Sequence, residues 1–149
     1  MSKKNTILLT AALGAVVALA PVAANAATVM KIGFATINDG QHKSAKWIAK
    51  EVMKRTNGSI DVKVYPAAQL GKIPRQIEGV LFGTQEAFIS PPGFFKGLNP
   101  AFAAPDAPGL FTSFAHQTKT MNHPSVRSKF LNLATAKGVT GLYISAAGA

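Results

Sequence analysis

Few residues of this chain have the type and spacing that covalent chemistry requires. The 149 residues include no cysteine, six acidic residues and three histidines. The histidines lack the spacing of a metal site, which clusters histidine, cysteine or carboxylate ligands. Ser90 has no candidate base near it in the sequence, and no glycine-rich phosphate loop or dinucleotide fingerprint is found. The sequence therefore predicts no catalytic residue, no metal site and no cofactor, and it does not favour an enzyme.

Two loops, in contrast, have the placement of a binding site. Residues 35–42 follow one predicted strand, and residues 90–94 follow another. In open α/β sheets, ligands bind beyond the carboxyl ends of the strands, where the order of connections reverses. Backbone N–H groups at the starts of the following helices point toward the same edge and favour an anionic group. We therefore expect the two loops to form one side of a binding site for a small ligand.

The elements that position these loops alternate between strands and helices. Residues 29–35 and 60–65 alternate apolar with polar side chains, as strands do, and residues 84–90 contain a short apolar run typical of a buried strand. Helical spacing of apolar residues predicts helices over 41–56 and 74–83. Strand, helix and strand in succession form βαβ units. The prediction is an α/β fold with a mainly parallel sheet flanked by helices.

The chain beyond the third strand is rich in residues that interrupt helices. Prolines and glycines recur from Pro91 to Gly109 among bulky apolar residues, which predicts a folded-back segment that seals the sheet edge and lines the site. Short helices are expected to begin at Ser113 and at Pro124, the second ending near residue 136, and a last strand is expected over 139–145.

The N-terminus has the features of an export signal. Two lysines precede an apolar stretch over residues 7–20, and Ala24-Asn25-Ala26 has the small-residue pattern at which such leaders are cleaved. We predict a signal peptide over residues 1–26. The alternative is a membrane anchor, but the apolar stretch is short for a span and contains Gly14.

The charge of the chain leaves a second function open. The formal net charge is +10, and such an excess can steer anionic partners. The basic residues are spread from Lys31 to Lys137, however, and most phenylalanines lie in apolar segments. A groove for nucleic acid would pair basic residues with stacking aromatic rings, so we expect no nucleic-acid partner. A small secreted basic protein that binds anionic surfaces remains the alternative function.

Three motifs, in order along the chain, carry a resemblance to a known family. They are TNGSIDVKVYPAAQLG, QIEGVLFGTQEA and PAFAAPDAPGLF, between residues 56 and 111. This series resembles the periplasmic solute-binding subunits, of the dicarboxylate-binding type, of TRAP transporters (tripartite ATP-independent periplasmic transporters). Those proteins share a T-x-G-x-I-x-V-x-V-[FY]-P-x-x-Q-L-G strand and loop, a Gly-Thr-x-[DE]-[AM] strand entry and a D-x-P-x-L-F segment. The resemblance covers nearly everything after residue 26.

The resemblance implies a fold, a function and a set of site residues. The fold is a periplasmic-binding-protein-like lobe, and the function is capture of a small organic acid in the periplasm for the membrane subunits of a TRAP transporter, without chemistry. The residues that match substrate-holding positions of the family lie in the two loops: Thr36, Asn38, Gln41, His42, Ser90 and Pro91. Pro91 departs from the polar residue that some members have, which leaves the identity of the substrate open.

Members of the family are much longer than this chain. Residues 27–149 are therefore expected to be an N-terminal lobe whose second lobe is missing, together with the arginine by which the family clamps a substrate carboxylate. Solute capture is expected to be impaired in a chain of this length, because hinge closure needs two lobes.

Overall fold

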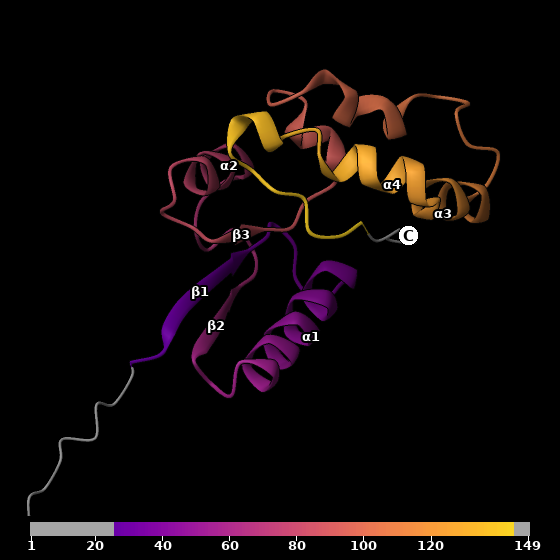
Figure 1. Ribbon diagram of the computed structural model, residues 1–149. Coiled ribbons are helices and arrows are strands. Elements are labelled where there is room, and N and C mark those ends of the chain that lie inside the picture. Colours follow the sequence, from indigo (N-terminus) through magenta and orange to yellow (C-terminus); the bar gives the residue numbers. More distant parts are fainter. Residues whose placement is uncertain (1–25, 145–149) are drawn as a thin grey trace, which may run out of the picture.

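The computed structural model describes residues 26–144, which form a small parallel sheet with helices around it (Figure 1). Within these residues the strands are β1 (Thr28–Gly33), β2 (Ile60–Tyr65) and β3 (Ala87–Phe88), joined by α1 (Gly40–Arg55) and α2 (Ile73–Leu81). Both neighbouring pairs of strands are parallel, in the order β2-β1-β3. The predicted α/β fold with a mainly parallel sheet is confirmed.

The strand order contains a reversal of direction. The chain passes from β1 through α1 to β2 on one side, and then through α2 to β3 on the other side of β1. At such a reversal, the connections that follow two adjacent strands lead away to opposite sides, and the space between them at the carboxyl ends of the strands is open to a ligand. Here those strands are β1 and β3, which pair in register with Gly33 opposite Phe88.

Helix α1 begins and ends where local signals in the sequence place it. The carboxylate of Asp39 accepts a hydrogen bond from the N–H of His42 at 3.1 Å and caps the helix. At the other end, Asn57 and Gly58 have φ values of 49° and 78°, the left-handed backbone that stops a helix. Small side chains of α1, Ala45 and Ala49, let it pack closely on the sheet (Figure 1).

The core lies between α1 and the sheet. It consists of Ile32, Phe34 and Val62 from the strand side and the two alanines of α1. Partly buried apolar residues surround this cluster, among them Ile48 and Ile89. Burial of such side chains is the main favourable term in folding, so the β1-α1-β2 unit is the stable base on which the loops at the carboxyl edge rest.

The second half of the described chain consists of short helical segments beyond the carboxyl ends of the strands (Figure 1). They are the 3₁₀ turns η1 (Pro92–Phe95) and η2 (Pro100–Asp106), the helices α3 (Phe114–Asn122) and α4 (Pro124–Leu131), and the turn η3 (Thr135–Lys137). Ser113 caps α3 and Pro124 opens α4, as predicted, but α4 ends before the expected residue 136 and is followed by η3. Within residues 26–144 no helix combines the length and apolar character that a membrane crossing requires.

A series of aromatic contacts joins this helical half to the sheet. The rings of Phe88, Phe95, Phe102 and Phe130 follow one another with centroid separations of 5.8, 5.7 and 5.3 Å. These rings come from β3, η1, η2 and α4. Edge-on and tilted pairs at such separations are favourable beyond the area that they bury, so the breaker-rich segment is folded onto β3.

The predicted last strand is wrong for the residues that the structure describes. Residues 139–144 pair with no strand, and residue 145 lies outside the described range. Instead, the N–H groups of Val139 and Gly141 donate to the carbonyls of Ala134 and Leu131. A strand needs a neighbour with free backbone groups, and no described segment supplies one here. The predicted signal peptide lies outside the described residues, apart from residue 26.

Candidate functional site

The two predicted loops leave the sheet side by side. Beyond the pair of Gly33 and Phe88, the N–H of Ile89 donates to the carbonyl of Gly33 at 3.0 Å. The first loop therefore begins at Phe34 and the second at Ser90, from adjacent strand ends. This arrangement follows from the strand order, because β1 and β3 are neighbours only if the two crossovers run in opposite directions.

The first loop is shaped by His42. The imidazole Nδ1 accepts a hydrogen bond from the backbone N–H of Asn38 at 3.0 Å, and the ring packs against Phe34 with centroids 5.5 Å apart. A neutral imidazole whose Nδ1 accepts carries its proton on Nε2. This bond stabilises the left-handed backbone of Asn38, whose φ is 61°. His42 is buried, whereas Thr36 and Asn38 are exposed at the loop surface. Of these three predicted site residues, His42 supports the loop and the other two face solvent.

Two further predicted residues carry polar atoms without a partner. The side-chain oxygens of Gln41 and Ser90 are buried and accept or donate no hydrogen bond among the described residues. Most buried polar side-chain atoms in proteins are hydrogen-bonded, so each exception needs an explanation. A water molecule or a bound polar solute would supply the missing partner at either position.

Pro91 differs from the other five candidates. It is exposed, and its carbonyl accepts from the N–H of Phe94 at 3.2 Å at the start of η1. A proline has no N–H to offer a ligand. In this loop, therefore, Ser90 is the residue that can donate a hydrogen bond from its side chain, and Pro91 sets the direction of the chain.

The N-terminus of α1 is already occupied by a negative charge, contrary to the expectation that it would attract an anion. The hydroxyl of Thr36, first, and the N–H of His42 hold the pKa of the Asp39 carboxyl below its ordinary value. The carboxylate thus stays ionised, and it accepts the hydrogen bond that the helix N–H could otherwise donate to a ligand. A second anion placed here would be repelled. The first loop therefore offers neutral polar groups instead of a positive field.

Tyr143 is a polar residue of this region that the sequence did not indicate. Its hydroxyl is buried and has no hydrogen bond of good geometry among the described residues, although the Ser44 hydroxyl of α1 lies nearby. Burial raises the pKa of the Tyr143 hydroxyl, and the neighbouring Ser44 opposes the shift. Ser44 is one helical turn from Gln41. No local signal could have revealed Tyr143, because its place depends on how residues 138–144 pack.

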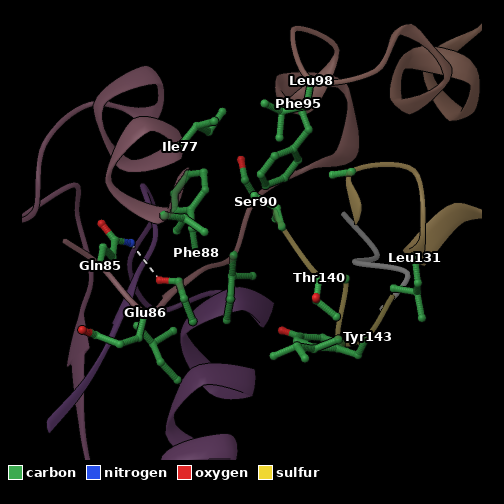
Figure 2. Close-up of a pocket in the computed structure, with 18 of the residues that line it drawn as sticks. Ile77, Gln85, Glu86, Phe88, Ser90, Phe95, Leu98, Leu131, Thr140 and Tyr143 are labelled. Atoms are coloured by element: carbon green, nitrogen blue, oxygen red, sulfur yellow. Dashed lines mark hydrogen bonds between the residues drawn. The ribbon is translucent and has the colours of Figure 1, made fainter. Parts of the chain in front are cut away.

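A cavity of about 550 Å³ lies beside β3 (Figure 2). Its walls are mostly apolar and come from β1, β3, α1, α2, α4, the turns η1 and η2, and the segment 138–144. Ser90 lies on one side of it, and Thr140 and Tyr143 on another. Of the six predicted site residues, Ser90 alone lines this cavity; the first loop lies outside it. The structure thus brings the loop starts together, but it divides the candidate residues between the cavity and the open edge.

The comparisons with known proteins define the class. The model of bacterial extracellular solute-binding protein family 7 (DctP) matches residues 33–149. The chain belongs to this family. The solved structures similar to it include periplasmic solute-binding proteins of TRAP transporters, and the described fold fits one lobe of such a protein. The predicted resemblance and the periplasmic-binding-protein-like fold are therefore confirmed.

Individual relatives give the extent of the similarity. The 2,3-diketo-L-gulonate-binding periplasmic protein YiaO of Escherichia coli is 35% identical over 98 residues, which are 65% of this chain and 30% of YiaO. A TRAP periplasmic solute-binding protein of Desulfovibrio salexigens with bound orotic acid is 29% identical, with a TM-score of 0.67 over 74% of this chain and 36% of its own.

A third relative, from a Polaromonas species and bound to D-erythronate, is 28% identical, with a TM-score of 0.69 over 74% of this chain and 37% of its own. The chain thus spans about a third of the length of these relatives. They give no support to the alternative of a small basic protein that binds anionic surfaces.

Proposed function

We propose that this chain forms the N-terminal lobe of a periplasmic protein that captures a small organic acid and delivers it to the membrane subunits of a TRAP-type transporter. The observation that carries the proposal is the order β2-β1-β3, which makes the loops after β1 and β3 neighbours at one edge of a parallel sheet. Ligands of open α/β sheets bind at such a reversal. The family of the chain and its predicted leader support the periplasmic location.

The polar groups at this edge favour a solute that carries hydroxyl groups besides its carboxylate. Gln41 and Ser90 have buried oxygens free for hydrogen bonds, and Thr36 and Asn38 are exposed in the same loop as Gln41. All four side chains are neutral, and the nearest charge in the loop is the negative Asp39. Such groups pair with hydroxyls, whereas a carboxylate would be held best by a bidentate arginine from elsewhere in the protein. Two of the relatives are named for, or hold, hydroxylated acids: 2,3-diketo-L-gulonate and D-erythronate.

The proposal is tested by NMR titration of the chain from residue 27 with D-erythronate, L-gulonate, L-malate and orotate. A single lobe should bind weakly, with a Kd on the order of millimolar, so ligand concentrations of about ten times this Kd are needed. We expect D-erythronate or L-gulonate to shift the backbone amide signals of residues 36–42 and of Ser90, because the solute lies against both loops. L-malate, with a single hydroxyl, should shift them less.

Matched variants distinguish binding at the two loops from weak non-specific binding elsewhere on the surface. Gln41→Ala and Ser90→Ala should each reduce the shifts, because each removes a side-chain partner of the solute. Ser59→Ala serves as the control, since Ser59 is exposed between α1 and β2 and lies outside both candidate loops. Shifts spread over the basic surface, or equal responses in Ser59→Ala and Ser90→Ala, would refute the proposal.

A further inference from the structure

A buried pair of glutamine side chains lies next to the carboxyl end of β1. Gln85 also lines the cavity beside β3, but neither glutamine belongs to the two candidate loops. Gln76 of α2 is fully buried, and Gln85, which precedes β3, is 4% exposed. The amide Nε2 of Gln85 donates to Oε1 of Gln76 at 3.2 Å and to the carbonyl of Ala87 at 2.8 Å. Burial of a polar amide is unfavourable unless it is hydrogen-bonded, and an apolar side chain of this size would fill the space without that requirement. Packing alone therefore does not explain why two glutamines occupy this position.

The pair is packed directly on β1. A side chain at Gly33 would overlap Oε1 of Gln76 and lie 2.6 Å from Nε2 of Gln85. Gly33 is the last residue of β1 and precedes the first candidate loop. Its lack of a side chain is needed here for close approach, since its φ is not in the left-handed region. The two amides thus occupy the space behind the strand end from which the candidate loop starts.

From Gln76 a series of hydrogen bonds leads to the candidate loop. Nε2 of Gln76 donates to the carbonyl of Gly71 at 2.7 Å, and the N–H of Gly71 donates to the carbonyl of Ala68 at 2.8 Å. The N–H of Ala68 then donates to Phe34 at 3.0 Å, and the N–H of Ala67 donates to Thr36 at 2.9 Å. Both of the last acceptors are backbone carbonyls in the loop after β1. The side chain of Gln76 is thereby connected to Thr36.

The intermediate turn is held in an unfavourable backbone conformation. Ala67 and Ala68 have φ values of 52° and 57°. Consecutive residues with a Cβ rarely adopt the left-handed region, and they remain there only where the surroundings enforce it. The bonds to Phe34 and Thr36 enforce it on one side, and the bond from Gln76 to Gly71 enforces it on the other.

We propose that Gln76 is a positioning residue for the candidate loop: its amide fixes the turn over residues 66–71, and this turn holds the backbone of Phe34 and Thr36 in place before any solute binds. The proposal rests on the proposed function, because it assigns a purpose to the order of a loop that is proposed to contact the solute. Gln76 itself touches no solute in this account.

The first test measures the order of the turn without any ligand. Gln76→Met keeps the volume of the side chain but removes the bond to Gly71. We expect amide hydrogen exchange at Ala67 and Ala68 to become faster on the order of tenfold, since local opening determines exchange there. The N–H of Thr28, which donates to Ser59 at the other end of the sheet, should keep its rate. Unchanged exchange at Ala67 and Ala68, or an equal increase at every amide, would overturn the proposal.

Gln85→Met is the matched control. It removes the other amide of the same pair but leaves the bond from Gln76 to Gly71 intact. Exchange at Ala67 and Ala68 should then stay near the wild-type rate. If Gln76→Met fails to fold, the double variant Gln76→Met/Gln85→Met replaces it, because it leaves neither amide buried beside an apolar neighbour. Fast exchange at the turn in a stable double variant supports the proposal, and wild-type exchange overturns it.

The second test uses D-erythronate as the probe and separates this proposal from the proposed function. If the wild-type chain binds the probe at the two loops, Gln76→Met should weaken binding on the order of tenfold, and Gln85→Met should weaken it less. Faster exchange with unchanged affinity would refute a positioning role. If the wild-type chain binds none of the four acids, the proposed function fails, while the exchange result still decides whether Gln76 orders the loop.

Discussion

His42 and Gln41 are neighbours in the chain, yet the structure gives them different tasks. The ring of His42 is turned inward, accepts from Asn38 and packs on Phe34. The side-chain oxygen of Gln41 is buried with no partner among the described residues. Residue type alone did not separate them, because both are polar and both belong to the same loop. A histidine near a candidate site should therefore be tested for an internal partner before it is assigned to a ligand.

Asp39 gives a prediction at the residue scale. Its pKa in the folded chain is below the ordinary value of 3.8, because the Thr36 hydroxyl and the His42 N–H stabilise the carboxylate. A lowered pKa means that the charged form stabilises the folded state above the unfolded pKa, and that this contribution is lost as the pH falls through the folded pKa. Asp39→Asn, which can still cap α1, should lower stability at pH 7.

The difference between wild type and Asp39→Asn should shrink as the pH falls below 3.8 and through the lowered pKa of Asp39, where the wild-type carboxylate becomes protonated. Urea unfolding of both chains across this range checks the prediction. Ser113→Ala, which removes the cap of α3 but no charge, is the control and should show a loss independent of pH. A gap between wild type and Asp39→Asn that grows at low pH would contradict the assignment.

At the scale of elements, the accuracy of prediction follows the range of the interactions involved. Strand β2 is predicted to the residue, and α1 within one residue at each end, because alternation, the Asp39 cap and the Asn57-Gly58 stop are all local signals. The last strand over 139–145 is wrong because a strand needs a partner, and no partner can be read from the segment itself. The place of Tyr143 beside Ser44 was unpredictable for the same reason.

The candidate site likewise has features that local sequence signals predict and features that depend on long-range packing. Two loops at the carboxyl edge follow from the succession of strands and helices, and the structure makes them neighbours. The Ser90 and Gln41 oxygens are buried, which no local pattern in the sequence indicates. The Gln76–Gln85 pair was equally hidden, because Gln76 lies in a helix whose apolar face was predicted from its neighbours.

The turn over residues 66–71 gives a prediction at this scale. Ala68 has a φ of 57°, which costs a residue with a Cβ about 1–2 kcal/mol, whereas glycine adopts it freely. Ala68→Gly should therefore stabilise the chain by roughly 0.5–1 kcal/mol, after the greater freedom of glycine in the unfolded chain is subtracted. The free energy of unfolding in urea measures the change. Ala104→Gly, in η2 where φ is not positive, is the control and should destabilise; destabilisation by Ala68→Gly as well would contradict the prediction.

At the scale of the whole molecule, the chain consists of a β1-α1-β2 base and a helical half joined through the edge strand. The aromatic series from Phe88 to Phe130 crosses this junction. The two candidate loops arise where the two parts meet (Figure 1). Because β3 has only two residues and carries both the second loop and the first ring of the series, the geometry of the site depends on how firmly the helical half is packed.

The apolar cavity beside β3 has a practical consequence for work with this chain. A space of about 550 Å³ is large enough for a drug-sized guest, and its walls are mostly hydrophobic. We expect the native chain to bind the uncharged dye Nile red saturably, with a fluorescence increase that disappears on unfolding. Thr140→Trp, at an exposed residue of the cavity wall, should weaken the dye signal, whereas Lys137→Trp, outside the wall, should not.

Equal staining of both tryptophan variants would place the dye elsewhere. If the expectation holds, fluorescence of an apolar dye, commonly read as a mark of a molten or misfolded preparation, would in this protein accompany correct folding. Screening buffers for the lowest dye signal would then discard the well-folded material, and purification should be guided by cooperative unfolding instead.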